Sequence, residues 1–340
     1  LPLSHIAERQ IVEFSSINTG GEIWFNESLA TLATDLPRCR PHLFFGPPRA
    51  WDQLRQSVTA KFGGAEALDA AIANDQAGVQ ALVISALGLD EVEYCLTAAA
   101  PTPPALINWW DAVGVKLCEG FGQTEAMGLI ITDPQNRRIG SIGQPAGEVE
   151  VKVGGNDELL IKAAGCTPGY YNRPDKTAEL WQDGWLHTGD KVRIDDDGFI
   201  FITGRVKDYF KTIQGKFVAP PPIEGLFADN PHSEQQCLLG RGYSKTVMIT
   251  VLNEPSRLLP REEVEAAALA TVESINASIE KHARIGAIIF SKTPWTIENE
   301  ILTPTMKIRR EQIENTFGED AERLARDGAE KGSIQLHWVD

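Results

Sequence analysis

The sequence has few of the features that mark membrane-spanning or zinc-binding proteins. It contains no apolar run of about 18 residues, which excludes a transmembrane helix. Cys-x-x-Cys pairs and paired histidines are also absent, so a structural zinc site is not predicted. The five cysteines are odd in number and widely scattered, which favours reduced thiols in a cytoplasmic protein.

Positive charge is also scarce. The 340 residues include 32 lysines and arginines against 47 aspartates and glutamates, for a formal net charge of −15. This balance argues against general nucleic-acid binding, which normally needs basic patches. It leaves room for a small anionic ligand, because local fields can differ from the net charge. The length predicts two folding units, since single cores stop growing at roughly 250–300 residues.

The order of helical and strand-like segments predicts an α/β fold in the first part of the chain. Residues 1–138 alternate between the two kinds of segment, as in α/β layers. Residues 139–204 contain short alternating stretches and many glycines, which predicts antiparallel β structure in the form of a small β-barrel. Residues 205–340 are predicted to form a compact α+β unit, with the boundary at the Gly204–Arg205 turn.

Individual elements follow from periodicity and from flanking turn residues. We expect helices over residues 6–18, 28–40, 65–87, 106–113, 261–271, 272–282 and after Ile308. We expect strands over residues 22–25, 41–45, 94–98, 115–119, 236–240 and 247–252.

Residues 186–211 carry the most informative pattern. Asp190 follows a Thr-Gly turn, a predicted β-hairpin comes next, and a second glycine turn carries Arg205 and Lys207. A carboxylate can accept hydrogen bonds from both ribose hydroxyls, and an arginine fork can hold phosphate or ribose oxygens. The hairpin would bring the two groups together, so this stretch predicts one wall of a nucleotide site.

A second segment, EGFGQTEAMG, covers residues 119–128. Its glycines permit close approach of the backbone to a ligand, and Phe121 offers a flat face for a base. Thr124 provides a hydroxyl, and the carboxylate of Glu125 suits Mg²⁺. The preceding residues 97–101, TAAAP, are small enough for a flat ring to pass. A glycine-rich turn of this kind is more often only a turn.

Several further residues are ambiguous when taken singly. Lys307, in ILTPTMKIRR, is the kind of lysine that normally lies solvated at a surface, although a mobile ammonium group could neutralise a carboxylate and a phosphate together. His5, in LPLSHIAER, is more often a packed structural histidine. His187 is expected to shape its turn. Lys211 and Lys216 are compatible with either a phosphate contact or a solvated surface.

Taken in order, these segments resemble the adenylate-forming superfamily, which includes acyl-CoA synthetases, luciferases and peptide-synthetase adenylation domains. Its YGxTE-type signature matches residues 121–125, with Phe121 in place of tyrosine, and its TGD signature matches residues 188–190. The GRxKD hinge signature matches residues 204–208, followed by KxxxGxxVxPxxIE at residues 211–224. The C-terminal lysine signature matches at Lys307, where Met306 replaces the usual glycine.

The amino-acid sequences of four segments are similar to those of the long-chain fatty-acid–CoA ligase branch: LPLSHIAER, EGFGQTEA, VAPPPIE and LTPTMKIRR. The resemblance implies that residues 1–204 are the rear of the large AMP-binding domain and that residues 205–340 are the small mobile domain. The Ser/Thr/Gly-rich phosphate loop of the family does not occur in this sequence, and it would precede LPLSH. The expectation is therefore a C-terminal portion, or truncated form, of such an enzyme.

The resemblance also implies a two-step reaction. A fatty carboxylate attacks ATP to give acyl-adenylate and pyrophosphate, and the thiol of coenzyme A then displaces AMP. Lys307 and Mg²⁺ would neutralise charge in the first step, with Glu125 as the Mg²⁺ ligand and Thr124 as a phosphate contact. His5 would lie beside the acyl carboxylate. Lys207 would be the hinge that moves Lys307 away before the thiol enters.

The remaining roles concern the nucleotide and the thiol. Asp190 would hold the ribose hydroxyls, and Arg205 the ribose–phosphate. Gly215 would line the pantetheine passage. The adenine would lie against a set of small and aromatic residues: Ala98, Ala99, Ala100, Phe121 and Gly122.

Two alternatives stay open from the sequence. One is another acyl-adenylate-forming enzyme, including one that hands its product to a carrier protein, although no carrier serine motif follows Arg310. The other is a non-catalytic fragment that binds nucleotide or acts as an interaction module. The expected partners are fatty acid, ATP and coenzyme A, in the cytoplasm and compatible with peripheral membrane association. The sequence carries no signal for acyl chain length or oligomeric state.

Overall fold

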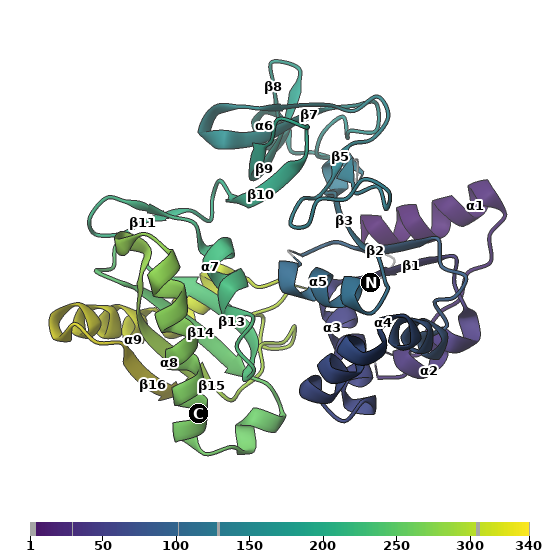
Figure 1. Ribbon diagram of the computed structural model, residues 1–340. Helices are drawn as coiled ribbons and strands as arrows, with labels where there is room; N and C mark the ends of the chain where they lie inside the picture. Colours follow the sequence, from purple (N-terminus) through teal and green to yellow (C-terminus); the bar gives the residue numbers. More distant parts are fainter. Residues whose placement is uncertain (1–4, 29, 101, 128–129, 304–306, 340) are drawn as a thin grey trace. The chain divides into compact units, whose positions relative to one another are not determined.

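Contacts in the computed structural model divide the chain into two compact units (Figure 1). Unit 1 comprises Leu1–Thr188 and Val192–Ile202, and unit 2 comprises Gly189–Lys191 and Thr203–Asp340. The structure describes residues 5–28, 30–100, 102–127, 130–303 and 307–339. Within these ranges no helix is long and apolar enough to cross a membrane. The domain boundary expected at residues 204 and 205 stays a prediction.

The first sheet of unit 1 has the order β1-β2-β3-β4-β5. Its first three strands are parallel, with Thr97 opposite Gly46 and Glu119, and the last two are antiparallel. Parallel neighbours need long crossovers, which helices supply here. The strands are β1 (Leu43–Gly46), β2 (Tyr94–Thr97), β3 (Leu117–Phe121), β4 (Ile130–Ile131) and β5 (Gln144–Pro145).

The helices within residues 32–112 share one hydrophobic core with this sheet. Trp51 and Trp110 are fully buried there, with ring centroids 5.1 Å apart in an edge-to-face arrangement. Gly88 ends the longest helix at φ +64°, where a Cβ atom would come within 2.5 Å of Pro37 Cα. The helical segments of this part are η1 (Glu8–Phe14), α1 (Ser15–Thr19), α2 (Leu32–Cys39), α3 (Pro48–Lys61), α4 (Ala65–Leu87) and α5 (Pro104–Ala112).

The second sheet, of order β10-β9-β7-β6, holds the strand that carries Asp190, and β8 pairs with β9. Residues along β9 alternate between buried and half-buried positions, so Thr188, Asp190 and Val192 share the inward face. The elements are β6 (Glu150–Val153), β7 (Glu158–Lys162), α6 (Pro174–Leu180), β8 (Trp181–Gln182), β9 (Trp185–Ile194) and β10 (Ile200–Arg205), with short helical turns η2 (Thr124–Ala126) and η3 (Gly155–Asp157) earlier in the chain.

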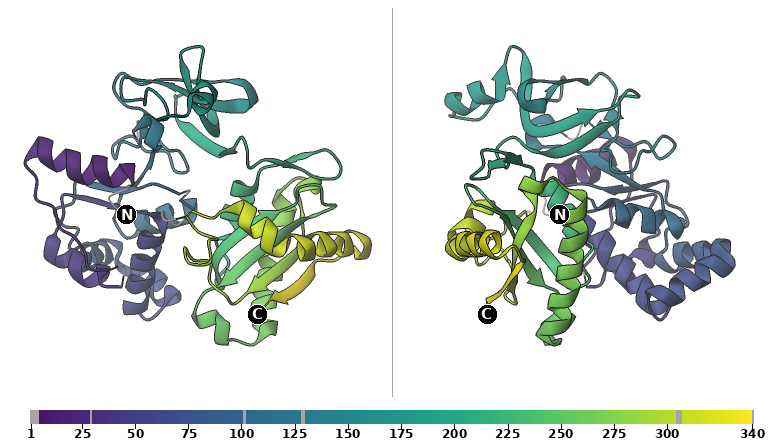
Figure 2. Two further views of the ribbon diagram at one scale, coloured as in Figure 1. Left: turned by 180° about the vertical axis from the view of Figure 1, so that it is seen from behind. Right: turned by 60° about the vertical axis from the view of Figure 1, so that its left-hand side comes forward.

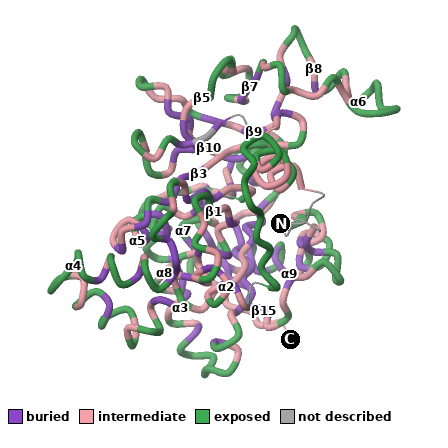
Figure 3. Tube along the Cα trace, turned by 90° about the vertical axis from the view of Figure 1, so that its right-hand side faces the viewer, coloured by how far each residue is buried: buried purple, intermediate pink, exposed green. Residues whose placement is uncertain are grey.

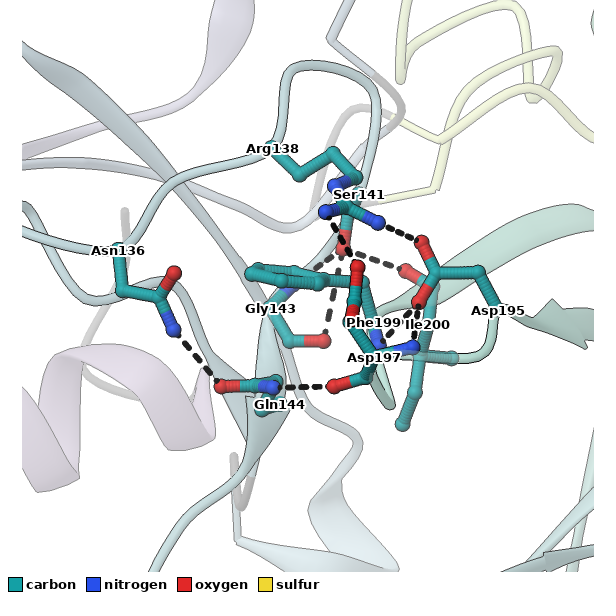
Figure 4. A network of polar contacts seen from close by, with 9 residues as sticks. All are labelled: Asn136, Arg138, Ser141, Gly143, Gln144, Asp195, Asp197, Phe199 and Ile200. Carbon is teal, nitrogen blue, oxygen red and sulfur yellow. Dashed lines mark hydrogen bonds and ion pairs between the residues drawn. The ribbon is translucent and has the colours of Figure 1, made fainter.

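A polar network fixes the turn between β9 and β10 (Figure 4). The Arg138 guanidinium pairs with Asp195 and, at 2.8 Å, with Asp197, and lies 4.5 Å over the ring of Phe199. The Ser141 hydroxyl donates to the carbonyl of Ile200 at 2.9 Å. Because the turn is tied to the preceding segment, the register of β9 and the inward placement of its buried residues are fixed with it.

Unit 2 is a four-stranded sheet of order β13-β14-β15-β16 with helices on both faces (Figure 2). The first pair is antiparallel and the others are parallel. β14 and β15 are buried along their whole length. Figure 3 shows how far the residues along the chain are buried. α7 and α8 pack on one face and α9 on the other. The elements are β11 (Phe210–Lys211), β12 (Phe217–Val218), α7 (Pro220–Phe227), β13 (Ser233–Leu239), β14 (Thr246–Leu252), η4 (Pro255–Leu258), α8 (Arg261–Ser278), η5 (Lys281–Ala283), β15 (Ile285–Ser291), α9 (Arg310–Lys331) and β16 (Gln335–Val339).

The structure confirms the mixed α/β class and most of the expected elements, with α4 matching its predicted bounds. The strand expected at residues 22–25 is wrong, because Trp24 and Phe25 are exposed and no strand forms there. The two helices expected between residues 261 and 282 are the single helix α8, since no glycine or proline interrupts the sequence. α3, α7 and the strands β15 and β16 were not predicted.

We predict that Trp51→Ala lowers the free energy of unfolding of unit 1 by about 3–5 kcal/mol. The side chain is fully buried, and its Nε1 donates to the Leu96 carbonyl at 3.2 Å, so truncation leaves both a cavity and an unpaired acceptor. Urea unfolding followed by fluorescence measures the loss. Trp24→Ala is the control, because Trp24 is 56% exposed. Equal losses in the two variants would contradict the core assignment.

Candidate functional site

The carboxyl ends of two neighbouring parallel strands bring together the predicted adenine residues of unit 1. Ala98, Ala99 and Ala100 follow β2, and Phe121 and Gly122 lie at and after the end of β3. The strands are in register at Thr97 and Glu119. A Cβ atom on Gly120 would lie 3.9 Å from that of Ala98, so the two segments are in close contact. Ala99 has φ +74°, which turns the chain sharply beside Gly120.

The buried carboxyl group of Glu119 holds this turn in place. Its Oε1 accepts a hydrogen bond from the backbone N–H of Thr102 at 3.3 Å, and the Thr102 hydroxyl lies 3.3 Å from that of Thr97. Burial raises the pKa of Glu119 to about 7, against the lowering effect of the Thr102 bonds. Sequence reasoning assigned no role to Glu119. An acidic residue at the end of a buried strand was the available signal.

Thr124 and Glu125 lie on the short helical turn η2 that follows β3. Thr124 is exposed and Glu125 is half-buried. The hydroxyl of Tyr170 donates a hydrogen bond to Glu125 Oε1, and the N–H of Thr167 donates to the Glu125 carbonyl at 2.8 Å. The bond to Glu125 raises the pKa of Tyr170 to about 12. Tyr170, which sequence reasoning missed, therefore orients this carboxylate.

The donor set of Glu125 fits Mg²⁺ as a nucleotide-bound ion. In nucleotide sites the ion is commonly held by one or two carboxylates together with phosphate oxygens. Among the described residues, no group of three or more His, Cys, Asp or Glu side chains could hold a metal ion on its own. The half-buried Glu125 carboxylate, oriented by Tyr170, is a suitable single oxygen ligand.

His5 lies half-buried at the start of the first helical segment. Its Nδ1 accepts a hydrogen bond from the N–H of Ala7 at 3.2 Å. In the neutral ring this places the proton on Nε2. Part of the LPLSH motif, Pro101 of the TAAAP segment and Gly128 of the EGFGQTEAMG segment lie outside the described residues.

In unit 2, Asp190 and Arg205 form a direct ion pair. Arg205 Nε donates to Asp190 Oδ1 at 2.9 Å, and the pairing of β9 with β10 is extended by the bond from Val206 N–H to the Gly189 carbonyl at 2.8 Å. The Asp190 side chain is 6% exposed and that of Arg205 is 53% exposed. Arg205 thus bridges between the buried carboxylate and the solvent.

The charge of Lys307 also acts on Asp190. Burial raises the pKa of the Asp190 carboxyl group above its usual value, while the positive charges of Arg205 and Lys307 oppose that rise and Asp208 adds to it. Since these charges influence one another, unit 2 brings Asp190, Arg205 and Lys307 into one electrostatic neighbourhood. This grouping joins two motifs that are more than a hundred residues apart in sequence.

The backbone around Lys307 is held by two hydrogen bonds to Thr303. The N–H of Lys307 donates to Thr303 Oγ1 at 3.0 Å, and the Thr303 N–H donates to the Lys307 carbonyl at 2.8 Å. Lys307 is exposed. Pro304 and Met306, which belong to the same predicted motif, lie outside the described residues. Lys207 is exposed in the turn after β10, and Gly215 is exposed in the β11–β12 turn at φ +72°.

We predict that Glu119→Gln gains stability relative to the native chain as the pH rises. The folded chain keeps the Glu119 proton up to about pH 7, whereas a glutamate in the unfolded chain loses it near 4.5. The folded native chain therefore loses relative stability across this interval, by about 3 kcal/mol, and the glutamine variant does not.

Urea unfolding of both chains between pH 4.5 and 8 measures this difference. The exposed Glu148→Gln serves as the control. If the free energies of unfolding of Glu119→Gln and the native chain differ by the same amount at every pH, the assignment of a buried, protonated carboxyl group is contradicted.

Comparisons with known proteins agree with these features. The profile of the AMP-binding enzyme family matches residues 1–171, and that of the AMP-binding enzyme C-terminal domain matches residues 207–327. A carboxylic acid reductase of Mycobacterium tuberculosis is 30% identical over 99% of this chain and 30% of the reductase. A putative fatty-acid–CoA ligase, fadD11, of the same species is 26% identical over 95% of this chain and 65% of the ligase.

Among solved structures, the adenylation domain of a carboxylic acid reductase from Segniliparus rugosus, in complex with AMP and a carboxylic acid, has a TM-score of 0.77. It is 26% identical, and the match covers 96% of this chain and 54% of that domain. The chain thus spans between about a third and two thirds of the length of these relatives. Two family profiles cover most of it, and the chain belongs to the AMP-binding family of adenylate-forming enzymes.

Proposed function

We propose that the protein is an ATP-dependent fatty-acid–CoA ligase, which joins a long-chain fatty acid to coenzyme A through an acyl-adenylate. The observation that carries this proposal is the grouping of Asp190, Arg205 and Lys307 in unit 2. It gives a nucleotide a carboxylate for its ribose, a guanidinium for its oxygens and an ammonium group for the reacting phosphate. The ligase relatives, at 26–28% identity, support the choice of acid and acceptor.

In this proposal Asp190 accepts hydrogen bonds from both ribose hydroxyls. Its carboxylate is buried, where hydrogen bonds to an ionised group are stronger than in water. Arg205 holds one carboxylate oxygen at 2.9 Å and so sets the direction of the group. The guanidinium has further N–H donors for ribose or phosphate oxygens, because only Nε is engaged in that bond.

The first chemical step forms a bond between a carboxylate oxygen of the acid and the α-phosphorus of ATP. The bond from that phosphorus to the bridging oxygen breaks, and pyrophosphate leaves. Lys307 places a positive charge between two anions that would otherwise repel each other. Mg²⁺, when bound, would add to this neutralisation, with Glu125 as its protein ligand and Thr124 as a phosphate contact.

The remaining roles belong to the same proposal. Phe121 and Gly122, with Ala98, Ala99 and Ala100, form the adenine surface, which the Glu119–Thr102 bond supports. His5 contacts the acyl carboxylate through Nε2. Lys207 acts as the hinge about which Lys307 withdraws. Gly215 lines the passage by which the pantetheine thiol reaches the acyl carbon, where the new C–S bond forms and AMP leaves.

A second candidate is the adenylation part of an enzyme that passes the acyl group to a carrier protein. The carboxylic acid reductase of M. tuberculosis favours it, being 30% identical over 99% of this chain. Both candidates share the acyl-adenylate and a pantetheine thiol. Supplying free coenzyme A and a phosphopantetheinylated carrier protein in separate assays distinguishes them. The proposal includes action in the cytoplasm, at or near membranes that supply fatty acid.

We predict that Lys307→Ala lowers the rate of acyl-adenylate formation by about 100-fold or more, because it removes charge stabilisation that the step requires. Pyrophosphate release measures this step. Thioester formation from supplied acyl-adenylate and coenzyme A stays near the native rate. Lys331→Ala, at the exposed end of α9, is the control. An equal loss in both half-reactions would refute the role of Lys307.

We predict that Asp190→Ala weakens AMP binding by about 10- to 100-fold, the size expected for losing hydrogen bonds to a charged group. Calorimetric titration with AMP measures the affinity. The exposed Asp196→Ala, on the same hairpin, is the matched control and leaves the affinity unchanged. An Asp190→Ala variant with native affinity would rule out the ribose contact.

A further inference from the structure

The outer edge of β13 is covered by side chains. β13 lies at the end of the unit 2 sheet, with β14 on one side. An unpaired strand edge carries N–H and C=O groups that need partners. One group of contacts satisfies the backbone groups of Leu238, and a second group joins the side chain of Gln235 to a neighbouring segment. Both involve the segment that carries Lys307.

The first group is a closed ring of three hydrogen bonds at Leu238. The Leu238 N–H donates to Glu224 Oε1 at 2.7 Å, and Arg310 Nη1 donates to the Leu238 carbonyl at 2.7 Å. Arg310 Nη2 closes the ring with a bond to Glu224 Oε1 at 2.8 Å. The guanidinium fork is matched to this geometry, because its two N–H groups reach two acceptors at once.

The second group lies three residues earlier on the strand. The side-chain amide of Gln235 accepts a bond from the N–H of Trp295 at 3.0 Å and donates one to the Trp295 carbonyl at 3.2 Å. The Gln235 side-chain amide therefore pairs with the backbone of Trp295 as a neighbouring strand would. Trp295 itself is buried in the core beneath α9.

These two clamps, at Gln235 and at Glu224–Arg310, hold Trp295 and Arg310, which lie on either side of Lys307 in the chain. Between the clamps the segment is tied to itself. The Leu302 N–H donates to the Thr296 carbonyl at 2.9 Å, and the Arg309 N–H donates to the Ile301 carbonyl at 2.8 Å. With the Thr303 bonds, these contacts fix the Lys307 backbone relative to β13.

The Glu224–Arg310 clamp favours a positioning role over a contribution to net stability. The Glu224 and Arg310 side chains are 17% and 18% exposed. Taking a charge pair out of water cancels much of its attraction, so such pairs add little net stability. They are nevertheless costly to separate, because separation leaves a buried charge unpaired. The pair therefore holds one geometry, three residues from Lys307.

We propose that Glu224, Arg310 and Gln235 are positioning residues for Lys307. By tying Trp295 to Gln235 and Arg310 to Leu238 and Glu224, they hold the Lys307 ammonium group in the neighbourhood of Asp190 and Arg205 before substrate binds. None of the three touches a reacting atom in this proposal. The inference rests on the proposed function for its catalytic consequence, and on unit 2 alone for its structural one.

Arg310→Lys tests the ring directly, because it keeps the positive charge and loses the fork. Its matched control is Arg257→Lys. Arg257 likewise binds a glutamate and a backbone carbonyl, away from the Lys307 segment: Glu234 of β13 at 3.0 Å and the carbonyl of Leu252 at 2.9 Å. Gln235→Ala tests the other clamp and remains informative if Arg310→Lys does not fold.

Two measurements are made on the complete chain: amide hydrogen exchange over residues 296–309, and the rates of the two half-reactions. We expect Arg310→Lys and Gln235→Ala to exchange faster over this segment and to slow adenylation by up to about 100-fold, as a displacement near 1 Å would. Thioester formation from supplied acyl-adenylate should stay within about twofold of native, far below that displacement effect. Arg257→Lys should change neither quantity.

Unchanged exchange over residues 296–309 in both variants would overturn the clamp inference, whatever the rates. Equal slowing of both half-reactions would overturn its catalytic consequence. A native chain that releases no pyrophosphate would instead count against the proposed function, and the exchange comparison would then decide the clamp by itself.

Discussion

The buried carboxylate of Asp190 is the constraint on which the rest of the arrangement depends. Alternation along β9 turns it inward, where loss of solvent disfavours its charged form and raises its pKa. The positive charges of Arg205 and Lys307 oppose that rise. In the proposed function the two ribose hydroxyls donate hydrogen bonds to this carboxylate. The same three residues thus serve both the electrostatics of unit 2 and the proposed recognition of a nucleotide.

Hydrogen bonds from neighbouring residues hold the candidate site side chains in place. In unit 1 the Glu119–Thr102 bond supports the turn at Ala98, Ala99 and Ala100, and Tyr170 orients the carboxylate of Glu125. In unit 2 the clamps on β13 set the segment that carries Lys307. In each case a short segment is fixed by a hydrogen bond to a polar group outside it. This is the arrangement expected where a mobile side chain must act from a defined position.

Local signals were enough to predict much of this from sequence. The alanine-rich composition of residues 65–87 predicted α4 with its observed bounds, and ordered motifs identified the family. The strand expected at residues 22–25 failed because apolar residues alone do not create a pairing partner. The Tyr170–Glu125 bond and the Arg310–Glu224 bond join residues 45 and 86 positions apart, which no local pattern encodes. The choice between the ligase and the reductase relatives likewise depends on which thiol accepts the acyl group. The site residues have the same roles in both candidates, so they do not decide it.

The most direct test of the account is a comparison of AMP with 2′,3′-dideoxy-AMP in calorimetric titrations of the native chain. If Asp190 accepts hydrogen bonds from the ribose hydroxyls, removing both hydroxyls weakens binding by about 10- to 100-fold, since the buried carboxylate is left without those donors. Equal affinity for the two nucleotides would show that the carboxylate does not recognise the ribose, and would contradict the central claim.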